Sequence, residues 1–143
     1  MSYALPKLLF PVAGKPILER TMEHLSSFGV DEVILAVNYL ADQLRDYFGE
    51  EYRRVKIKYS LEPRPLGTGG PIAFARQYYR SETLLAMNGD ILSEIDIDAM
   101  RKVHKSCSAL ATVALHEVDD PTRFGVARLE HSRIREFVEK PKL

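Results

Sequence analysis

Two short segments of the chain combine residue types that bind phosphates and metal ions. In the first, Gly67, Thr68, Gly69 and Gly70 follow one another directly, and glycines let a backbone approach a ligand closely. A helix predicted to begin just after them would offer free N–H groups and a positive dipole end to a phosphate or to the polar edge of a base. A flexible turn before a helix fits the same glycines, so this segment alone leaves both interpretations open.

The second segment, Asn88-Gly89-Asp90, follows an apolar run that is predicted to form a buried strand. A carboxylate at the carboxyl end of a parallel strand lies where α/β proteins bind their ligands. One carboxylate together with nucleotide phosphates is typical of a Mg²⁺ site, because Mg²⁺ prefers oxygen ligands and keeps several waters. Asn-Gly is also common in tight turns, so a solvated turn without a ligand stays open as an alternative.

Lysines stand near both ends of the chain, in Pro6-Lys7 and in Glu139-Lys140-Pro141. A lysine beside a phosphate acts as a point charge, but solvated surface lysines are far more common. The alternating basic residues of 53–58 favour the solvated face of an edge strand, which charge protects from aggregation.

Composition excludes several other kinds of site. The 143 residues carry 20 Lys+Arg and 20 Asp+Glu, and zero net charge gives no reason to expect nucleic-acid binding. The single cysteine, Cys107, excludes an internal disulfide framework and a Cys-based zinc site. No apolar stretch approaches the roughly 20 residues that span a bilayer, and residues 1–25 lack a signal-peptide pattern. We therefore expect a single domain, residues 1–143, in the cytoplasm.

The candidate site residues lie in a sequence of alternating predicted strands and helices. This alternation is typical of an α/β fold. Extended segments are predicted at 7–12, 33–37, 55–59, 84–87, 109–115, 124–129 and 134–138, and helices at 16–28, 40–48, 72–79 and 97–104. We predict Val33–Val37 and Leu84–Met87 as buried parallel neighbours, with the helix from Pro16 packed against them through Leu18, Met22 and Leu25. The order predicts a mostly parallel, Rossmann-like layered sheet with helices on both faces and a final antiparallel β-hairpin.

Five segments, in the same order, resemble the sugar-1-phosphate nucleotidyltransferases. They are PKLLFPVAGKP (6–16), EPRPLGTGG (62–70), NGD (88–90), FGV (124–126) and EKP (139–141). Members of that family attach a sugar-1-phosphate to the α-phosphate of a nucleoside triphosphate and release pyrophosphate. The resemblance implies their nucleotide-diphospho-sugar transferase fold, Mg²⁺ as cofactor, and these two substrates as partners, without nucleic acid or membrane. We also expect a homo-oligomer.

The resemblance further implies roles for individual residues. Lys7 and Asp90 would be catalytic, Lys7 by steadying the triphosphate and Asp90 by binding Mg²⁺. The remaining candidates are substrate-binding: Glu62, Gly67, Thr68 and Gly69 at the base, Gly125 under the sugar, Glu139 on its hydroxyls and Lys140 on its phosphate. Asp90, the Gly67–Gly70 turn and Lys140 should converge on one cleft. Catalysis would then consist mainly of alignment and charge neutralisation.

Both ends depart from the family pattern. The family's Gly-x-Gly-Thr-Arg-Leu loop and the central strand before it do not occur in residues 1–6, and its second metal-binding aspartate would lie beyond Pro141. We therefore expect a core fragment, truncated at both ends and inactive alone. Its sheet should show a groove beside Val33–Val37, either open or filled by another chain, because a missing interior strand leaves backbone groups unpaired.

More than one function stays open at this point. A carboxylate such as Glu62 accepts hydrogen bonds from the N1–H and N2–H of guanine, whereas thymine and uracil offer a single N–H. This favours GTP, with mannose-1-phosphate or a similar sugar phosphate as second substrate. The alternatives are a thymidylyl- or uridylyltransferase acting on glucose-1-phosphate, and a non-catalytic module of the same fold used in regulation or assembly.

Overall fold

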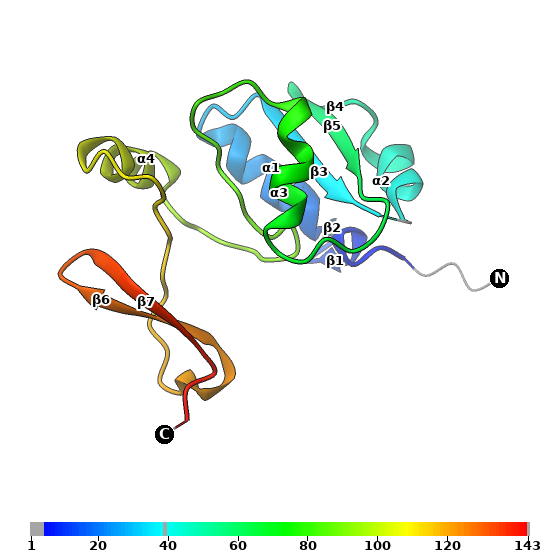
Figure 1. Cartoon of the computed structure of the whole chain (residues 1–143). Coiled ribbons are helices and arrows are strands. Elements are labelled where there is room, and N and C mark those ends of the chain that lie inside the picture. The colour runs from blue at the N-terminus through cyan, green and yellow to red at the C-terminus, as the bar shows by residue number, and fades with distance from the viewer. Residues whose placement is uncertain (1–4, 39, 143) are drawn as a thin grey trace. The chain divides into compact units, whose positions relative to one another are not determined.

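The computed structural model describes residues 5–38 and 40–142 of the chain. They divide into two compact units, Met1–Ile97 and Asp98–Leu143. Figure 1 shows strands layered with helices in the first unit, and a helix followed by a β-hairpin in the second. That both units belong to a single domain stays a prediction. In the described part of the chain, no helix has both the length and the apolar content required to cross a membrane.

A three-stranded sheet forms the centre of the first unit, in the order β3-β5-β4. β3 (Glu32–Val37) and β5 (Val55–Leu61) run parallel, and β4 (Glu51–Tyr52) pairs with β5 in the antiparallel sense. Val55, Ile57 and Tyr59 of β5 are buried, whereas Lys56 is exposed and Lys58 intermediate, which confirms the alternation predicted for Val55–Tyr59. The predicted edge position is wrong, because strands lie on both sides of β5.

Helices cover both faces of this sheet. α1 (Ile17–Ser27) and α2 (Ala41–Phe48) lie on one face, while α3 (Gly70–Phe74) and the 3₁₀ segment η2 (Ala75–Tyr78) cross the other (Figure 1). α1 begins one residue after the predicted start, and it buries Leu18, Met22 and Leu25 as predicted. The α/β fold class with helices on both faces is therefore confirmed.

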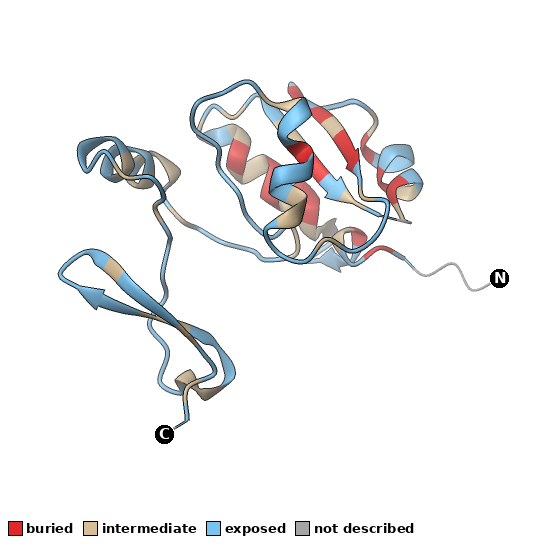
Figure 2. Ribbon diagram, viewed as in Figure 1, coloured by how far each residue is buried: buried red, intermediate tan, exposed pale blue. Residues whose placement is uncertain are grey.

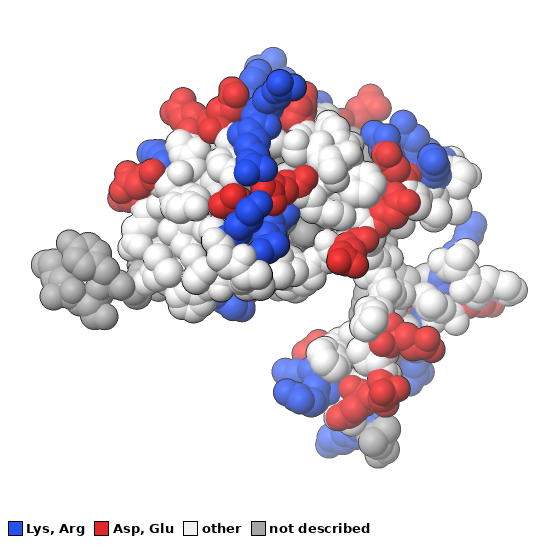
Figure 3. Space-filling view, turned by 180° about the vertical axis from the view of Figure 1, so that it is seen from behind, with Lys and Arg blue, Asp and Glu red and all other residues white. Residues whose placement is uncertain are grey.

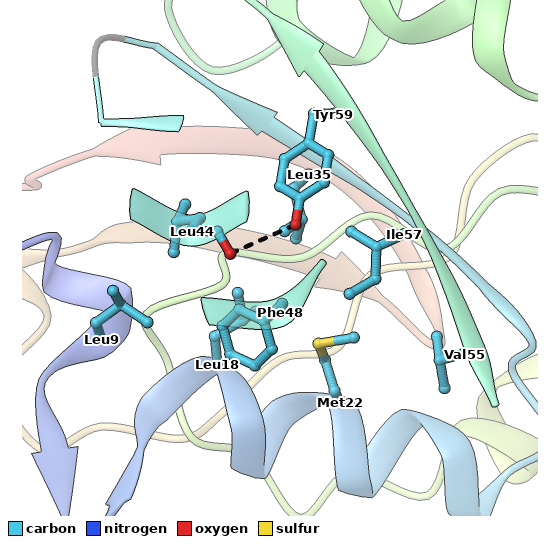
Figure 4. Close-up of a cluster of buried hydrophobic side chains, with 9 residues drawn as sticks. All are labelled: Leu9, Leu18, Met22, Leu35, Leu44, Phe48, Val55, Ile57 and Tyr59. Carbon is cyan, nitrogen blue, oxygen red and sulfur yellow. Dashed lines mark hydrogen bonds between the residues drawn. The ribbon is translucent and has the colours of Figure 1, made fainter. Parts of the chain in front are cut away.

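The core lies between α1, α2 and the sheet. Figure 4 shows the apolar side chains that meet there, from α1, β3, α2, β5 and the 3₁₀ turn η1 (Lys7–Leu9): Leu9, Leu18, Met22, Leu35, Leu44, Phe48, Val55, Ile57 and Tyr59. The Tyr59 hydroxyl donates a hydrogen bond of 2.6 Å to the carbonyl of Gly49. A buried hydroxyl needs such a partner, and this one joins β5 to the end of α2.

Two predicted strands are absent. Leu84–Met87 and residues 109–115 are irregular, and Leu84, Leu85 and Met87 are 40–42% exposed. The prediction that Leu84–Met87 pairs with Val33–Val37 is wrong, since the parallel neighbour of β3 is β5. A strand requires a partner for its backbone groups. Leu84–Met87 does not supply one for the other edge of β3, and no other described strand pairs with that edge. Lys7–Leu9, predicted as extended, forms a 3₁₀ turn, η1, before the short β1–β2 hairpin (Pro11–Val12 and Lys15–Pro16).

The second unit contains α4 (Ile97–Ser106, beginning at the boundary), the short 3₁₀ turn η3 (Pro121–Arg123), and the predicted hairpin of β6 (Gly125–Glu130) and β7 (Arg133–Glu139). This hairpin is confirmed, with antiparallel pairing from Gly125↔Glu139 to Glu130↔Arg133. Figure 2 shows that the buried residues of the described chain lie in the first unit. Acidic and basic side chains are interspersed on the surface that Figure 3 shows. The first unit contains ion pairs of Glu23 with Lys15 and Arg53, and of Glu32 with Lys58.

The burial pattern predicts that a leucine-to-alanine substitution lowers the stability of the fold by different amounts at Leu18 and at Leu84. Leu18→Ala should destabilise the protein by about 2–5 kcal/mol, because it leaves a cavity in the core at a side chain that is 2% exposed. Leu84→Ala should change stability by no more than about 0.5 kcal/mol, because Leu84 is 42% exposed. Urea denaturation measures both. Equal losses would place Leu84 in a buried strand after all.

Candidate active site

Lys7 and Asp90, 83 positions apart in the sequence, meet in the first unit. The Lys7 Nζ lies 2.5 Å from the Asp90 Oδ2. Lys7 opens η1, where the Leu9 N–H donates to the Pro6 carbonyl at 2.8 Å, and Leu9 anchors that turn in the core. The packing of η1 therefore holds the backbone from which the Lys7 side chain extends.

Asp90 is positioned by the glycine before it. A Cβ at Gly89 would lie 3.1 Å from Leu8 Cδ2 and 3.8 Å from Leu18 Cδ1, so the turn packs closely against η1 and α1, and a side chain at residue 89 would require Leu8 to shift. The sequence marks this glycine as part of a turn. Its packing role could not be recognised without knowing that Leu8 and Leu18 lie beside it.

The ion pair keeps the Asp90 carboxyl ionised. The hydrogen bond from Lys7 lowers the pKa of Asp90 below its ordinary value of 3.8, and the positive charge of Lys7 adds to this effect against the opposing effect of desolvation. Within the described residues, no three His, Cys, Asp or Glu side chains lie close enough to hold a metal ion together. A lone carboxylate such as Asp90 is compatible with Mg²⁺, which keeps water and phosphate oxygens among its ligands, and its role as a metal ligand stays a prediction.

Glu62 organises the glycine-rich segment. It directly follows β5, and its Oε2 accepts a hydrogen bond of 3.2 Å from the Leu66 N–H, which closes the loop that leads to Gly67. Gly67 has a positive φ of 75°, a conformation that side chains disfavour. α3 begins at Gly70, so the predicted turn before a helix is confirmed. Whether Gly67, Thr68 and Gly69 contact a base stays a prediction.

Lys7 and Glu62 line one cavity, of about 210 Å³, at the carboxyl ends of β3 and β5. Val37 and Asn38 line it as well. It lies at the carboxyl end of the Val33–Val37 strand. The groove that the sequence predicts beside this strand, in place of a missing neighbouring strand, stays a prediction. Small-molecule sites typically measure 300–1,000 Å³, so this volume suits part of a nucleotide, such as its base, and not the whole molecule.

The other three predicted residues meet in the hairpin of the second unit. Gly125 and Glu139 are register partners in β6 and β7, and a Cβ at Gly125 would lie 2.9 Å from Glu139 Oε2. The Lys140 N–H donates to the Phe124 carbonyl at 2.9 Å, and its Nζ lies 3.5 Å from Glu139 Oε1. Sequence reasoning placed all three at a sugar phosphate without recognising that they are neighbours. Since Lys140 and Asp90 belong to different units, their convergence stays a prediction.

Comparison with known proteins defines the class of protein. Residues 1–143 match the family model described as nucleotidyl transferase, and the chain belongs to this family of sugar-1-phosphate nucleotidyltransferases. It is 38% identical over 152 residues to mannose-1-phosphate guanylyltransferase 1 of Arabidopsis thaliana, with all of this chain and 42% of that protein covered.

The name of a second relative indicates a different sugar. D-glycero-alpha-D-manno-heptose 1-phosphate guanylyltransferase of Aneurinibacillus thermoaerophilus is 37% identical over 136 residues, which cover 95% of this chain and 59% of the relative. Among solved structures, HddC from Yersinia pseudotuberculosis complexed with GMP-PN matches with a TM-score of 0.80 and 31% identity, over 99% of this chain and 63% of that one. The chain thus spans about two fifths to three fifths of the length of these relatives.

The Lys7–Asp90 pair predicts a shift in titration. Lys7→Met should raise the pKa of Asp90 towards 3.8, because the ammonium group holds it lower. By the same linkage, the pair stabilises the fold at neutral pH, and this contribution is lost as the pH falls below 3.8 through the folded-state pKa of Asp90. The pKa of Asp90 is measured by following its carboxyl ¹³C chemical shift against pH.

A matched control for this titration is Lys58→Met, which removes a lysine whose Nζ lies 2.6 Å from Glu32 Oε2. It should leave the Asp90 pKa unchanged. If Lys7→Met also leaves it unchanged, the two side chains do not pair in solution.

The hairpin predicts that Gly125→Ala moves the Glu139 carboxylate, since the new methyl group would lie 2.9 Å from its Oε2. The flexible end of Glu139 can give way, so we expect stability within about 0.5 kcal/mol of the parent and a changed ¹³Cδ shift at Glu139. Gly69→Ala, whose Cβ meets nothing within 4 Å, is the control. An unmoved Glu139 signal in Gly125→Ala would contradict the packing.

Proposed function

We propose that this chain carries the nucleotide- and metal-binding part of a sugar-1-phosphate nucleotidyltransferase that uses GTP and mannose-1-phosphate or a similar sugar phosphate. The observation that carries the proposal is the contact of Lys7 with Asp90. It joins two family segments, 6–16 and 88–90, in one place beside a cavity that Glu62 also lines. A cation, a metal-ligating carboxylate and a base-reading carboxylate are the groups that a nucleoside triphosphate requires.

In the proposed reaction, these residues form no covalent bond with the substrates. A phosphate oxygen of the sugar phosphate attacks the α-phosphorus, a new P–O bond forms, and the bond from that phosphorus to the bridging oxygen of the β-phosphate breaks, so that pyrophosphate leaves. Lys7 would neutralise charge that develops on the departing phosphates. Asp90 would hold Mg²⁺, which supplies further charge neutralisation on the phosphate oxygens when bound.

Glu62 supports the choice of GTP. Its carboxylate is an acceptor-only group when ionised, and guanine presents two adjacent donors on one edge. The two relatives named above are guanylyltransferases by their names, and HddC is described in complex with GMP-PN. A thymidylyltransferase structure also shares the fold, at 23% identity, which bears on the fold alone.

Three residues of the second unit would bind the other substrate. Glu139 would accept hydrogen bonds from sugar hydroxyls, Lys140 would pair with the sugar phosphate, and Gly125 would leave room for the ring beneath Glu139. Their cross-strand proximity supports a common ligand. A homo-oligomeric state and a cytoplasmic location remain expectations of the same proposal.

The test is nucleotide-sugar formation and pyrophosphate release by the full-length enzyme that contains this chain, with GTP, dTTP or UTP, each with mannose-1-phosphate and glucose-1-phosphate. We expect turnover with GTP and mannose-1-phosphate. Asp90→Asn should lower kcat by about 100-fold or more, because it removes the ligand charge while keeping the shape of the side chain. A preference for dTTP or UTP would contradict the choice of base.

Asp98→Asn provides the matched control. Asp98 also forms an ion pair, with Arg101 at 2.6 Å, and it lies outside the proposed site, so its loss should leave kcat unchanged. Near-normal turnover of Asp90→Asn would place the metal ion elsewhere.

A further inference from the structure

Asn38 lies beside Glu62 at the carboxyl ends of two parallel strands. The register of β3 and β5 runs to Val37↔Leu61, and Asn38 and Glu62 are the next residues of the two chains. The hydrogen bonding between the two strands extends as far as Glu62, whose N–H donates to the Val37 carbonyl at 2.8 Å. Neighbouring strands lie about 4.8 Å apart, so these two residues are close neighbours, and both line the cavity of about 210 Å³.

The Asn38 side chain is available to a ligand. The residue is exposed, and its side-chain amide forms no hydrogen bond with a described residue, while its backbone carbonyl accepts from the Ala41 N–H at 3.1 Å. The carbonyl bond holds the backbone at the start of α2 and leaves the side chain unused. Neither the predicted core nor the family segments account for an amide at this position.

Glu62 alone cannot match the whole edge of guanine. That edge presents two donors, N1–H and N2–H, beside the acceptor O6. An ionised carboxylate has no proton to donate, whereas an amide has two. Lys7 also lines the cavity, but its ammonium group is held by Asp90. Asn38 is therefore the neutral donor that stands next to Glu62.

We propose that Asn38 determines base specificity together with Glu62: the Asn38 amide donates a hydrogen bond to O6, and Glu62 accepts from N1–H and N2–H. The inference rests on the proposed use of GTP and deepens it. It assigns the recognition of one atom of the base to one side chain, which allows a test with nucleotides that differ at single groups.

The test measures binding by calorimetry, in the presence of MgCl₂ and without sugar phosphate. The probes are GTP, ITP, which lacks the 2-amino group, and 2-aminopurine riboside triphosphate, which lacks O6 and N1–H. Asn38→Ala should weaken GTP and ITP alike, by about 3- to 10-fold, and leave the 2-aminopurine nucleotide within about 2-fold. Asn38→Asp should weaken GTP further, because it places an acceptor against O6.

Two further variants complete the design. Glu62→Gln should reduce the preference for GTP over ITP, since it weakens the contact with the 2-amino group. Gln77→Ala removes another amide, one on η2 that donates to the Phe74 carbonyl at 3.5 Å, and should leave all three affinities unchanged. Because Asn38 is exposed, thermal melting of Asn38→Ala should match that of the parent.

The outcomes separate the inference from the proposed function. If Asn38→Ala weakens all three nucleotides equally, or none of them, Asn38 does not contact O6, although a preference of the parent for GTP would still support the proposed function. If the parent itself prefers dTTP or UTP, both the choice of GTP and the role of Asn38 are wrong.

Discussion

The parallel pairing of β3 with β5 is the interaction on which the rest of the first unit depends. It places Leu35 beside Tyr59, so that both strands offer apolar side chains to α1 and α2. The same register brings the carboxyl ends of the two strands to one edge, where Asn38, Glu62 and Lys7 line a cavity. A shift of one residue would turn the buried positions of β5 to the opposite face, and core and cavity would be lost together.

A second constraint is the close packing of η1 against the turn before Asp90. η1 is a single 3₁₀ turn, so its position comes from Leu9 in the core and from the contact of Leu8 with Gly89, and not from its own hydrogen bonds. The charges of Lys7 and Asp90 then stabilise each other. A site assembled in this way separates positioning from chemistry, because apolar contacts hold the backbone while the charged groups stay accessible to a ligand.

In the second unit, the pairing of two neighbouring strands positions the candidate site residues. Its described residues include no buried core, and the antiparallel ladder of β6 and β7 alone sets Gly125 against Glu139. β7 ends before Lys140, which has a left-handed backbone conformation with φ 44°. Such a hairpin is marginally stable in isolation, so we expect Gly125, Glu139 and Lys140, the residues proposed to bind the sugar phosphate, to be ordered mainly by contacts that the rest of the protein or a ligand provides.

The sequence by itself determined what depends on neighbouring residues. The helices α1 and α2, the β6–β7 hairpin and the turn before α3 follow from apolar periodicity and from glycines at fixed positions, all of which act within a few residues. The family segments are equally local, so that Lys7, Glu62, Asp90 and the residues around Glu139 could be chosen before any coordinates were known. The tertiary structure alone decided which strands pair. Apolar runs such as Val33–Val37 and Leu84–Met87 carry no mark of their partner, because the backbone groups that join strands are the same in every residue, and β3 pairs with β5 while Leu84–Met87 stays irregular. For the same reason the contact of Lys7 with Asp90, the packing of Gly89 and the position of Asn38 beside Glu62 could be found only from the folded chain, since each joins segments whose distance in space is set by long-range packing.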